Sequence, residues 1–276
     1  MISIEDYVVT PSKFPDGTML LKLDFGDINF DKTYIKEGFL VLNWYYENDA
    51  EIMTLYMVAK HLRENGFEDL ALYMPYLPNA RQDRVKNSED VFTLKYFCEL
   101  INSLNFKWVH IFDAHSAVGP ALLNNCINEN ARSAIMNVVI ELVQKRGINS
   151  DNLVIFYPDE GAMKRYSDLI SQPYAFGVKR RNWETGKIES LDVIGGDSIK
   201  GKDILIIDDI CSRGGTFYHS AKALKELDVN KIYLYITHCE NTILEGDLLE
   251  SGLIEEVFTT NSIFTKEHEK IKVIEI

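Results

Sequence analysis

Two adjacent carboxylates, Asp208 and Asp209, stand directly after a short apolar run and directly before a loop of small residues. Two carboxylates at the end of a buried parallel strand can accept hydrogen bonds from vicinal hydroxyl groups, which sugars carry. The loop continues with Ser212, Arg213, Gly214, Gly215 and Thr216. Glycines let backbone N–H groups approach an oxyanion closely, and a following helix turns its positive end toward that oxyanion. This stretch therefore predicts a site for a sugar phosphate.

A strand and an amphipathic helix must position this loop. Residues 204–207 form a continuous apolar run, which is typical of a parallel strand buried on both faces. Ala221, Leu224 and Leu227 keep the apolar spacing of a helix, so packing should hold the turn in place. The alternative is an ordinary turn with two solvated aspartates, which rarely carries the whole combination of residues.

A second polar cluster follows the strand predicted at residues 70–73, in a proline-bearing loop. The cluster consists of Asn79, Arg81, Gln82, Asp83 and Arg84. Guanidinium groups stack on bases and bind phosphates, and glutamine can read the edge of a base. The same run is also compatible with a solvated loop.

Two more predicted strands end in ligand-type residues. The strand at 108–112 is followed by Asp113 and His115, and a histidine there is either a ligand or a satisfied structural residue. The strand at 153–157 leads into PDEGAMKR, which sets Asp159 before a glycine turn and a helix start. That arrangement suits phosphate, and Asp159 is the best candidate there for a metal or hydroxyl ligand. Glu160 and Lys164 have the spacing of a helix salt bridge.

The segment 179–190, which follows a strand predicted at 174–178, is polar, charged and weakly periodic. We expect it to form a mobile hairpin or lid. Basic clusters are usually solvated, but this one lies between elements that should share a sheet edge near Asp208 and Asp209. Closure over an anionic substrate is therefore the predicted role of the segment.

Length and composition limit the possible classes of protein. The chain has 276 residues, of which 46% are hydrophobic, which is enough for about two domains with substantial cores. A net charge of -13 argues against a broad surface for nucleic acid or anionic membrane. The start lacks the features of a signal peptide, so a cytoplasmic location is expected. The four cysteines form no CxxC pair, so we expect reduced thiols.

The remaining pattern alternates strands and helices, which predicts two α/β units. The other expected strands lie at 39–44, 232–236, 256–258 and 271–274. One further helix is expected to start after Asp49. Three more are expected at about 90–104, 131–146 and 242–250.

Four motifs stand in the order in which the ribose-phosphate pyrophosphokinase family carries them: FPDG, YLPNARQDRV, FDAHS with PDEGAMKR, and DDICSRGGT. The chain resembles this family over nearly its whole length, and the last motif resembles the ribose-phosphate motif of type I phosphoribosyltransferases. The resemblance implies an α/β fold of two tandem phosphoribosyltransferase-type domains, each a mainly parallel sheet flanked by helices. Residues 1–130 would form the ATP side, and residues 131–276 would carry the ribose-phosphate loop and a flexible catalytic loop.

The resemblance also implies roles for the first three motifs. Phe14 and Asp16 would approach the adenine of ATP from a neighbouring subunit, while Arg81 and Gln82 hold the nucleotide. Asp113 and His115 would line the site for ATP and Mg²⁺. The pyrophosphate loop would consist of Asp159, Glu160, Gly161 and Ala162. The implied metal ligands are His115 and Asp159.

The same comparison makes Lys179 and Arg181 the catalytic cations. Asp208 and Asp209 would face the ribose hydroxyls. The 5-phosphate would bind to Ser212, Arg213, Gly214, Gly215 and Thr216. The chain departs from the family at Thr18, where Glu is usual, and at Ser212 and Arg213, where an acidic residue and Thr are more common. It also ends at Ile276 without the usual C-terminal helix, which leaves the oligomer size open.

The implied reaction is Mg²⁺-dependent attack of the C1 hydroxyl of ribose 5-phosphate on the β-phosphorus of ATP, which yields phosphoribosyl pyrophosphate and AMP. The implied assembly is a homo-oligomer with its active site near a subunit interface. Three alternatives stay open. In the first, the acceptor is ADP-ribose, for NAD salvage, and Arg213 binds its second phosphate or its adenine. Arg213 can equally point to solvent or pair with a carboxylate of the protein. The chain can instead be a type I phosphoribosyltransferase or a non-catalytic regulatory homologue.

Overall fold

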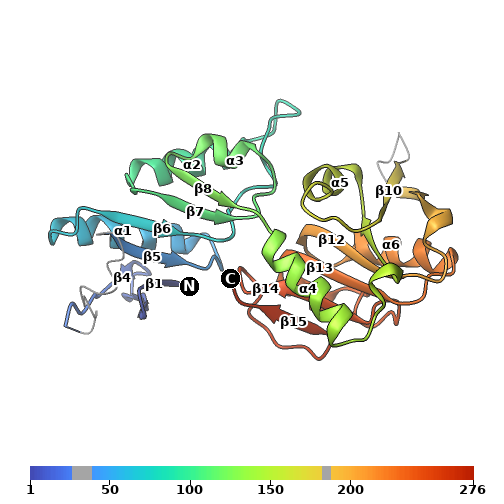
Figure 1. The fold of residues 1–276 in the computed structure, drawn as a ribbon. Coiled ribbons are helices and arrows are strands. Elements are labelled where there is room, and N and C mark those ends of the chain that lie inside the picture. Colours follow the sequence, from blue (N-terminus) through green and yellow to red (C-terminus); the bar gives the residue numbers. More distant parts are fainter. Residues whose placement is uncertain (27–38, 182–187) are drawn as a thin grey trace. The chain divides into compact units, whose positions relative to one another are not determined.

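The structure, a computed structural model, describes residues 1–26, 39–181 and 188–276. The chain divides into two compact units, Met1–Asn130 and Ala131–Ile276. Each unit has a main sheet and helices of its own (Figure 1). The predicted fold class, an α/β protein with two mainly parallel sheets, is confirmed.

The main sheet of the first unit has a parallel part and an antiparallel edge. Its strands in the described residues are β1 (Ile2–Ile4), β2 (Tyr7–Val9), β5 (Leu40–Trp44), β6 (Leu70–Tyr73), β7 (Val109–Phe112) and β8 (Cys126–Glu129). They lie in the order β2-β1-β5-β6-β7-β8. The four strands from β5 to β8 are parallel, whereas β1 pairs antiparallel with both of its neighbours. The sequence did not predict β1, β2 or β8.

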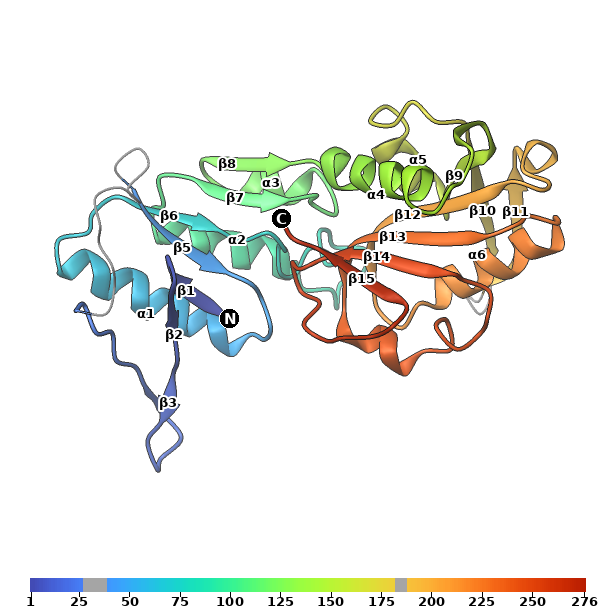
Figure 2. The same cartoon turned by 60° about the horizontal axis from the view of Figure 1, so that its bottom comes forward.

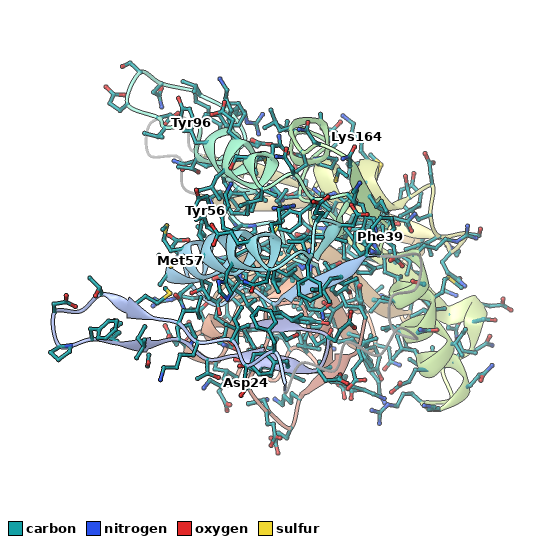
Figure 3. The ribbon with its side chains drawn as sticks, turned by 90° about the vertical axis from the view of Figure 1, so that its left-hand side faces the viewer. Asp24, Phe39, Tyr56, Met57, Tyr96 and Lys164 are labelled. Atoms are coloured by element: carbon teal, nitrogen blue, oxygen red, sulfur yellow. The ribbon has the colours of Figure 1, made fainter. Side chains whose placement is uncertain are left out.

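Three helices cover one face of this sheet: α1 (Ala50–Glu64), α2 (Thr93–Ser103) and α3 (Val118–Leu122). Leu42, Leu72 and Ile111 are fully buried in one cluster with residues of these helices, which places the core between sheet and helices. Tyr56 of α1 is 36% exposed, and Figure 3 labels it beside the exposed Met57.

Helix α2 begins at Thr93, three residues later than the predicted start at Asp90. The carboxylate of Asp90 accepts hydrogen bonds from the backbone N–H groups of Lys86 (2.8 Å) and Asn87 (2.9 Å). Asp90 therefore closes a turn in the preceding loop instead of opening the helix, which is the usual competition between a short acidic side chain and helix formation.

The main sheet of the second unit has seven strands in the described residues: β9 (Leu153–Tyr157), β10 (Tyr174–Arg181), β11 (Ile188–Ile194), β12 (Asp203–Cys211), β13 (Ile232–Cys239), β14 (Glu256–Thr260) and β15 (Ile271–Ile274). Their order is β11-β10-β9-β12-β13-β14-β15. All neighbours are parallel except β10 and β11, which form an antiparallel hairpin. This hairpin coincides with the one expected at 179–190, but residues 182–187 lie outside the described part of the chain.

Helices α4 (Arg132–Gln144), α5 (Glu160–Tyr166) and α6 (Gly215–Glu226) flank this sheet (Figure 2). On one face, Phe217 and Leu224 of α6 belong to the same buried cluster as Ile206 and Ile236 of the sheet. Single 3₁₀ turns occur at η1 (Ser150–Asn152), η2 (Gly196–Ser198) and η3 (Asn241–Glu245). The helix expected at 242–250 is wrong beyond η3, because the backbone turns to an extended conformation at Gly246, with φ -100° and ψ 169°.

Within the described residues, no helix has both the length and the apolar character needed to cross a bilayer. All four cysteines are free thiols, as expected.

Candidate active site

The carboxyl ends of β9, β10 and β12 meet at one edge of the second sheet. Ile206 pairs with Phe156, so two residues further on Asp208 is level with Pro158. Phe176 pairs with Tyr157, so the end of β10 runs level with the residues that follow β9. Neighbouring parallel strands deliver the residues after them to a common edge, where ligands of α/β sheets bind. The register thus brings together three segments that the sequence singled out separately.

Lys179 and Arg181 form the end of β10, where the backbones of residues 179 and 181 pair with Leu191 and Ile188 of β11. Their side chains fall outside what the structure describes. Their predicted catalytic role stays a prediction.

Asp208 and Asp209 have different surroundings. Asp208 is half-buried, and its Oδ1 accepts a hydrogen bond from the N–H of Asp209 at 3.0 Å. Burial, together with the nearby carboxylates of Asp209 and Asp159, raises the pKa of Asp208 well above its ordinary value. Asp209 is only 5% exposed, and its Oδ2 lies 2.6 Å from Nη1 of Arg165 on α5. One carboxylate thus lies among like charges, whereas the other has a cation beside it.

The loop between β12 and α6 forms an open anion cradle at the start of a helix. Gly214 adopts the left-handed conformation with φ 79°, and a Cβ there would lie 2.9 Å from Cδ2 of Leu248, so only glycine fits. A Cβ on Gly215 would meet nothing within 4 Å, which means that the space over the first residue of α6 is open. The N-cap residue makes no side-chain hydrogen bond to the helix start. The N–H groups of the first turn are therefore directed at a space that an oxyanion can occupy.

Arg213 is oriented toward η3. Its Nη2 lies 2.9 Å from Oε2 of Glu245, and the two side chains are 71% and 58% exposed. Of the two expectations for Arg213, pairing with a carboxylate is the one that the structure contains.

Asp159 caps the helix that follows β9. Its Oδ1 accepts a hydrogen bond from the N–H of Ala162 at 3.1 Å, which holds the start of α5 beside the sheet edge. Nζ of Lys164 lies 2.7 Å from Oε1 of Glu160 in an exposed pair, so the expected helix salt bridge is confirmed. The sequence did not predict the role of Arg165, although its place six residues after Asp159, in the same motif, was the available signal.

The nucleotide residues predicted in the first unit follow β6 and β7, at the carboxyl edge of that sheet. Tyr73 pairs with His110, so the loop with Arg81 and Gln82 begins level with the strand that ends before Asp113 and His115. Oγ1 of Thr93 donates a hydrogen bond to Oε1 of Gln82 at 2.7 Å, which ties the loop to the start of α2. Asp113 is 4% exposed with φ 47°, and its N–H donates to the carbonyl of Glu129 at 2.7 Å. A buried aspartate in left-handed backbone is typical of a functional position.

The remaining motif, FPDG, forms the tip of a hairpin between β3 (Ser12–Lys13) and β4 (Met19–Leu20). Oδ1 of Asp16 accepts hydrogen bonds from the N–H (2.9 Å) and the Oγ1 (2.7 Å) of Thr18, and these bonds lower the pKa of Asp16. Phe14 is 47% exposed. Thr18, which departs from the family's usual Glu, thus orients the aspartate of its own turn.

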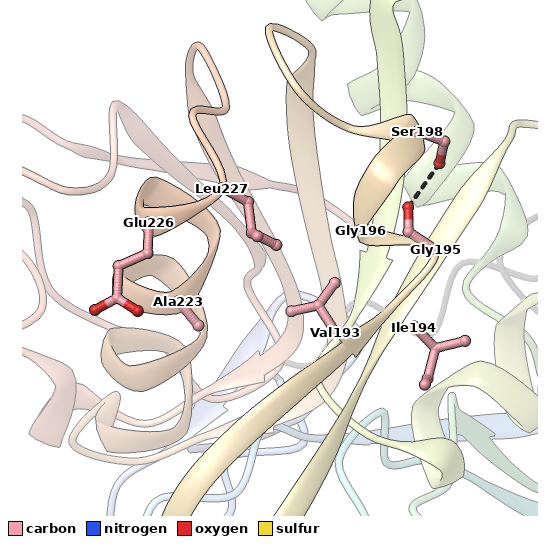
Figure 4. A pocket seen from close by; sticks show the side chains of 8 residues that line it. All are labelled: Val193, Ile194, Gly195, Gly196, Ser198, Ala223, Glu226 and Leu227. Carbon is pink, nitrogen blue, oxygen red and sulfur yellow. Dashed lines mark hydrogen bonds between the residues drawn. The ribbon is translucent and has the colours of Figure 1, made fainter.

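Two hollows among the described residues lie away from the strand-end carboxylates. One cavity of about 500 Å³ (Figure 4) is lined by Val193, Ile194, Gly195, Gly196, Ser198, Ala223, Glu226 and Leu227. These residues belong to the end of β11, to η2 and to the last turn of α6, which is about 16 Å along the helix from Gly215 at roughly 1.5 Å per residue. A cavity of about 600 Å³ separates the β3–β4 hairpin from α1. Neither cavity is lined by Asp159, Asp208 or the Gly214–Thr216 loop.

Known proteins resemble this chain over most of its length. The phosphoribosyl synthetase-associated domain family matches residues 184–276. The ribose-phosphate pyrophosphokinase of Thermococcus kodakarensis is 30% identical over 259 residues, which covers 92% of this chain and 85% of that protein. The ribose-phosphate pyrophosphokinase of Bacillus subtilis is 30% identical over 230 residues, which covers 81% of this chain and 69% of that protein.

A solved structure shares the fold. The phosphoribosylpyrophosphate synthetase from Mycobacterium smegmatis matches with a TM-score of 0.74 at 18% identity, over 97% of this chain and 86% of that chain. This match shows the fold, and the 30% identity to the Thermococcus kodakarensis protein shows the family that the motifs indicated. The chain belongs to the ribose-phosphate pyrophosphokinase family.

Proposed function

We propose that this protein transfers the β,γ-diphosphate of ATP to the C1 hydroxyl of ribose 5-phosphate, which yields phosphoribosyl pyrophosphate and AMP. The observation that carries the proposal is the juxtaposition of a strand-end carboxylate, Asp208, with the open helix start at Gly215. In the proposed complex, the backbone N–H groups of Gly215 and Thr216 bind the 5-phosphate. Asp208, with Asp209 behind it, accepts hydrogen bonds from the ribose hydroxyls.

Mg²⁺ fits the character of this site. No group of three or more His, Cys, Asp or Glu that could hold a metal ion occurs among the described residues. Mg²⁺ keeps most of its waters and binds one or two carboxylates together with substrate phosphates, so it does not require such a group. The crowding of Asp208 by Asp209 and Asp159 also favours a cation. We propose Asp159, in the second unit, as one of its protein ligands, and the predicted role of His115 in the first unit stays a prediction; when bound, Mg²⁺ would neutralise charge on the phosphate oxygens.

The residues of the chain then act mainly by positioning and by charge. Lys179 and Arg181, at the end of β10, are proposed to stabilise the oxygens of the transferred diphosphate as negative charge moves toward AMP. In the first unit, Arg81, Gln82 and Asp113 are proposed to hold the nucleotide. Since phosphoryl-type transfer needs little covalent chemistry from the protein, these roles are sufficient for the reaction.

Ribose 5-phosphate is favoured over ADP-ribose as the acceptor. The case for the longer acceptor depended on Arg213 as a cation for a second phosphate or an adenine. That guanidinium lies 2.9 Å from Glu245, which satisfies its charge locally. Two alternatives remain. A phosphoribosyltransferase would not need the polar loops of the first unit, and a non-catalytic regulatory homologue would not need Lys179, Arg181, Asp159 and His115.

Incubation of the purified protein with Mg²⁺, ATP and ribose 5-phosphate is expected to release AMP and to form no ADP. Nucleotide chromatography separates the two products, and phosphorus NMR identifies the new diphosphate on C1. In parallel, kcat/KM for ribose 5-phosphate should exceed that for ADP-ribose by about tenfold or more, because the unmatched adenosine must be desolvated without a partner. Exclusive formation of ADP, or no turnover with either acceptor, would contradict the proposal.

We propose further that the active site is shared between subunits of a homo-oligomer. The exposed Phe14 at the tip of the β3–β4 hairpin is the group expected to reach a neighbouring subunit's nucleotide. Phe14→Ala and Arg81→Ala should each inactivate the protein. The two inactive variants are then refolded together. If subunits pair at random, about half of the pairs contain both variants and one site of each such pair is wild type, so up to about a quarter of the activity should return. Mixtures that remain as inactive as either parent would show that each site is built within one subunit.

A further inference from the structure

Arg165 lies beside the sheet edge, and the motif roles leave it without a task. It lies on α5, six residues after Asp159, and its side chain is 23% exposed. Its Nη1 lies 2.6 Å from Oδ2 of Asp209, whose side chain is 7% exposed. An ion pair this short and this buried is strongly affected by the loss of either partner, since the remaining charge stays out of water.

The guanidinium is also held by packing. It lies over the ring of Tyr166 at 5.7 Å from the ring centre, and Tyr166 is fully buried. The ring of Tyr166 in turn stacks on Tyr157, at the end of β9, with ring centres 6.5 Å apart. Arg165 is thus held between the carboxylate of β12 and an aromatic pair that belongs to α5 and β9.

The pair is connected to Asp208 through the backbone. The N–H of Asp209 donates to Oδ1 of Asp208 at 3.0 Å, so the conformation of residue 209 determines where the carboxylate of residue 208 is held. An Asp209 side chain anchored by Arg165 keeps that peptide unit in place. Displacement of Asp209 would release one oxygen of Asp208 from its donor.

We infer that Arg165 is a positioning residue: it anchors Asp209, and through Asp209 it orients Asp208, which alone presents its carboxylate to the sugar. This inference depends on the proposed function, because it assigns different tasks to the two carboxylates of the ribose site. It also separates Arg165 from the phosphate-binding cations, since its guanidinium acts on the protein and not on the ligand.

The test measures steady-state kinetics of Arg165→Met, which keeps the length of the side chain and removes its charge. The KM for ribose 5-phosphate should rise about tenfold or more, whereas the KM for ATP should change by less than about twofold. Adding Asp209→Asn to Arg165→Met removes the carboxylate left without its cation, so the double variant should bind ribose 5-phosphate better than Arg165→Met alone. Arg165→Lys, which keeps the charge, should lie between wild type and Arg165→Met.

The matched control is Lys200→Met, which removes the cation of an ion pair with Asp228 at the surface, where both side chains are more than 70% exposed. It should leave both KM values unchanged. Thermal unfolding of each variant establishes that it is folded at the assay temperature. If Arg165→Met is unfolded there, the KM values of Arg165→Lys and of the double variant are compared instead.

Three results would overturn the inference. Arg165→Met with the kinetics of Lys200→Met would show that the pair does not orient the site. A double variant that binds ribose 5-phosphate more weakly than Arg165→Met would show that the carboxylate of Asp209 itself binds the sugar, so that Asp208 does not act alone. A wild-type protein that neither turns over nor binds ribose 5-phosphate in calorimetry would contradict both the proposed function and the inference. If the wild type is active, a negative result with the variants contradicts the inference alone.

Discussion

Lys179→Ala and Arg181→Ala should each lower turnover by about a hundredfold or more, since the loss of one group that stabilises developing charge typically costs about 3 kcal/mol of barrier. Both residues end β10, level with the loop that begins at Asp159. Cations at this edge would act when charge shifts from the transferred diphosphate toward AMP. The KM for ATP should therefore change much less than kcat, as expected for an interaction made mainly in the transition state.

Arg180→Ala provides the matched comparison, because it removes the same charge from the neighbouring position of the same strand. Its effect on kcat should be smaller. Steady-state kinetics of the three variants at saturating Mg²⁺ decides the matter. Three similar increases in the KM for ATP with unchanged kcat would mean that the strand end is only a general electrostatic patch.

Gly246→Ala is expected to have an effect of similar size from a distant position in the sequence. A Cβ on residue 246 would lie 1.9 Å from the carbonyl oxygen of Arg213, a backbone atom that directly precedes the Gly214–Thr216 loop. The loop cannot retreat easily, because Gly214 already lies against Leu248 in a left-handed conformation. We expect a loss of stability of about 2 to 3 kcal/mol from this overpacking. The displaced helix start should also lower kcat/KM for ribose 5-phosphate about a hundredfold, a fall that corresponds to about 2.7 kcal/mol.

Gly252→Ala separates this effect from general destabilisation. Residue 252 has φ 68°, and a Cβ there would meet nothing within 4 Å, so the substitution introduces backbone strain without a collision. It should lower stability by about 1 kcal/mol and leave the KM for ribose 5-phosphate unchanged. Thermal unfolding and kinetics of both variants provide the comparison. Gly246→Ala with wild-type stability and wild-type KM would mean that the backbone contact between residues 213 and 246 does not hold the phosphate loop.

The amino-acid sequence by itself determined the central strands and the polar residues that follow them. The apolar runs that begin at Leu153, Ile204 and Ile232 predicted strands correctly, because a strand buried on both faces has no polar positions that would blur its pattern. Strands at the margin were missed. β8 is partly exposed along its length and β1 has only three residues, so neither carries enough apolar periodicity to be recognised.

The motifs likewise indicated the loops of the site, because glycine and aspartate at a strand end have local physical meanings. Gly214 is needed for its backbone conformation, and Asp159 caps the helix that follows it. Such requirements act within a few residues, so they can be read from neighbouring letters of the chain.

Only the tertiary structure decided how the charged side chains divide their roles. The sequence left Asp208 and Asp209 equivalent, and it left Arg213 between substrate and protein partners. The fold brings Arg165 of α5 to Asp209 and Glu245 of η3 to Arg213, across 44 and 32 residues of chain respectively. A charge interacts with whatever lies within a few ångströms in space, and that neighbour is set by the packing of helices on the sheet. Sequence spacing therefore names the residues of this site, whereas the fold selects their partners.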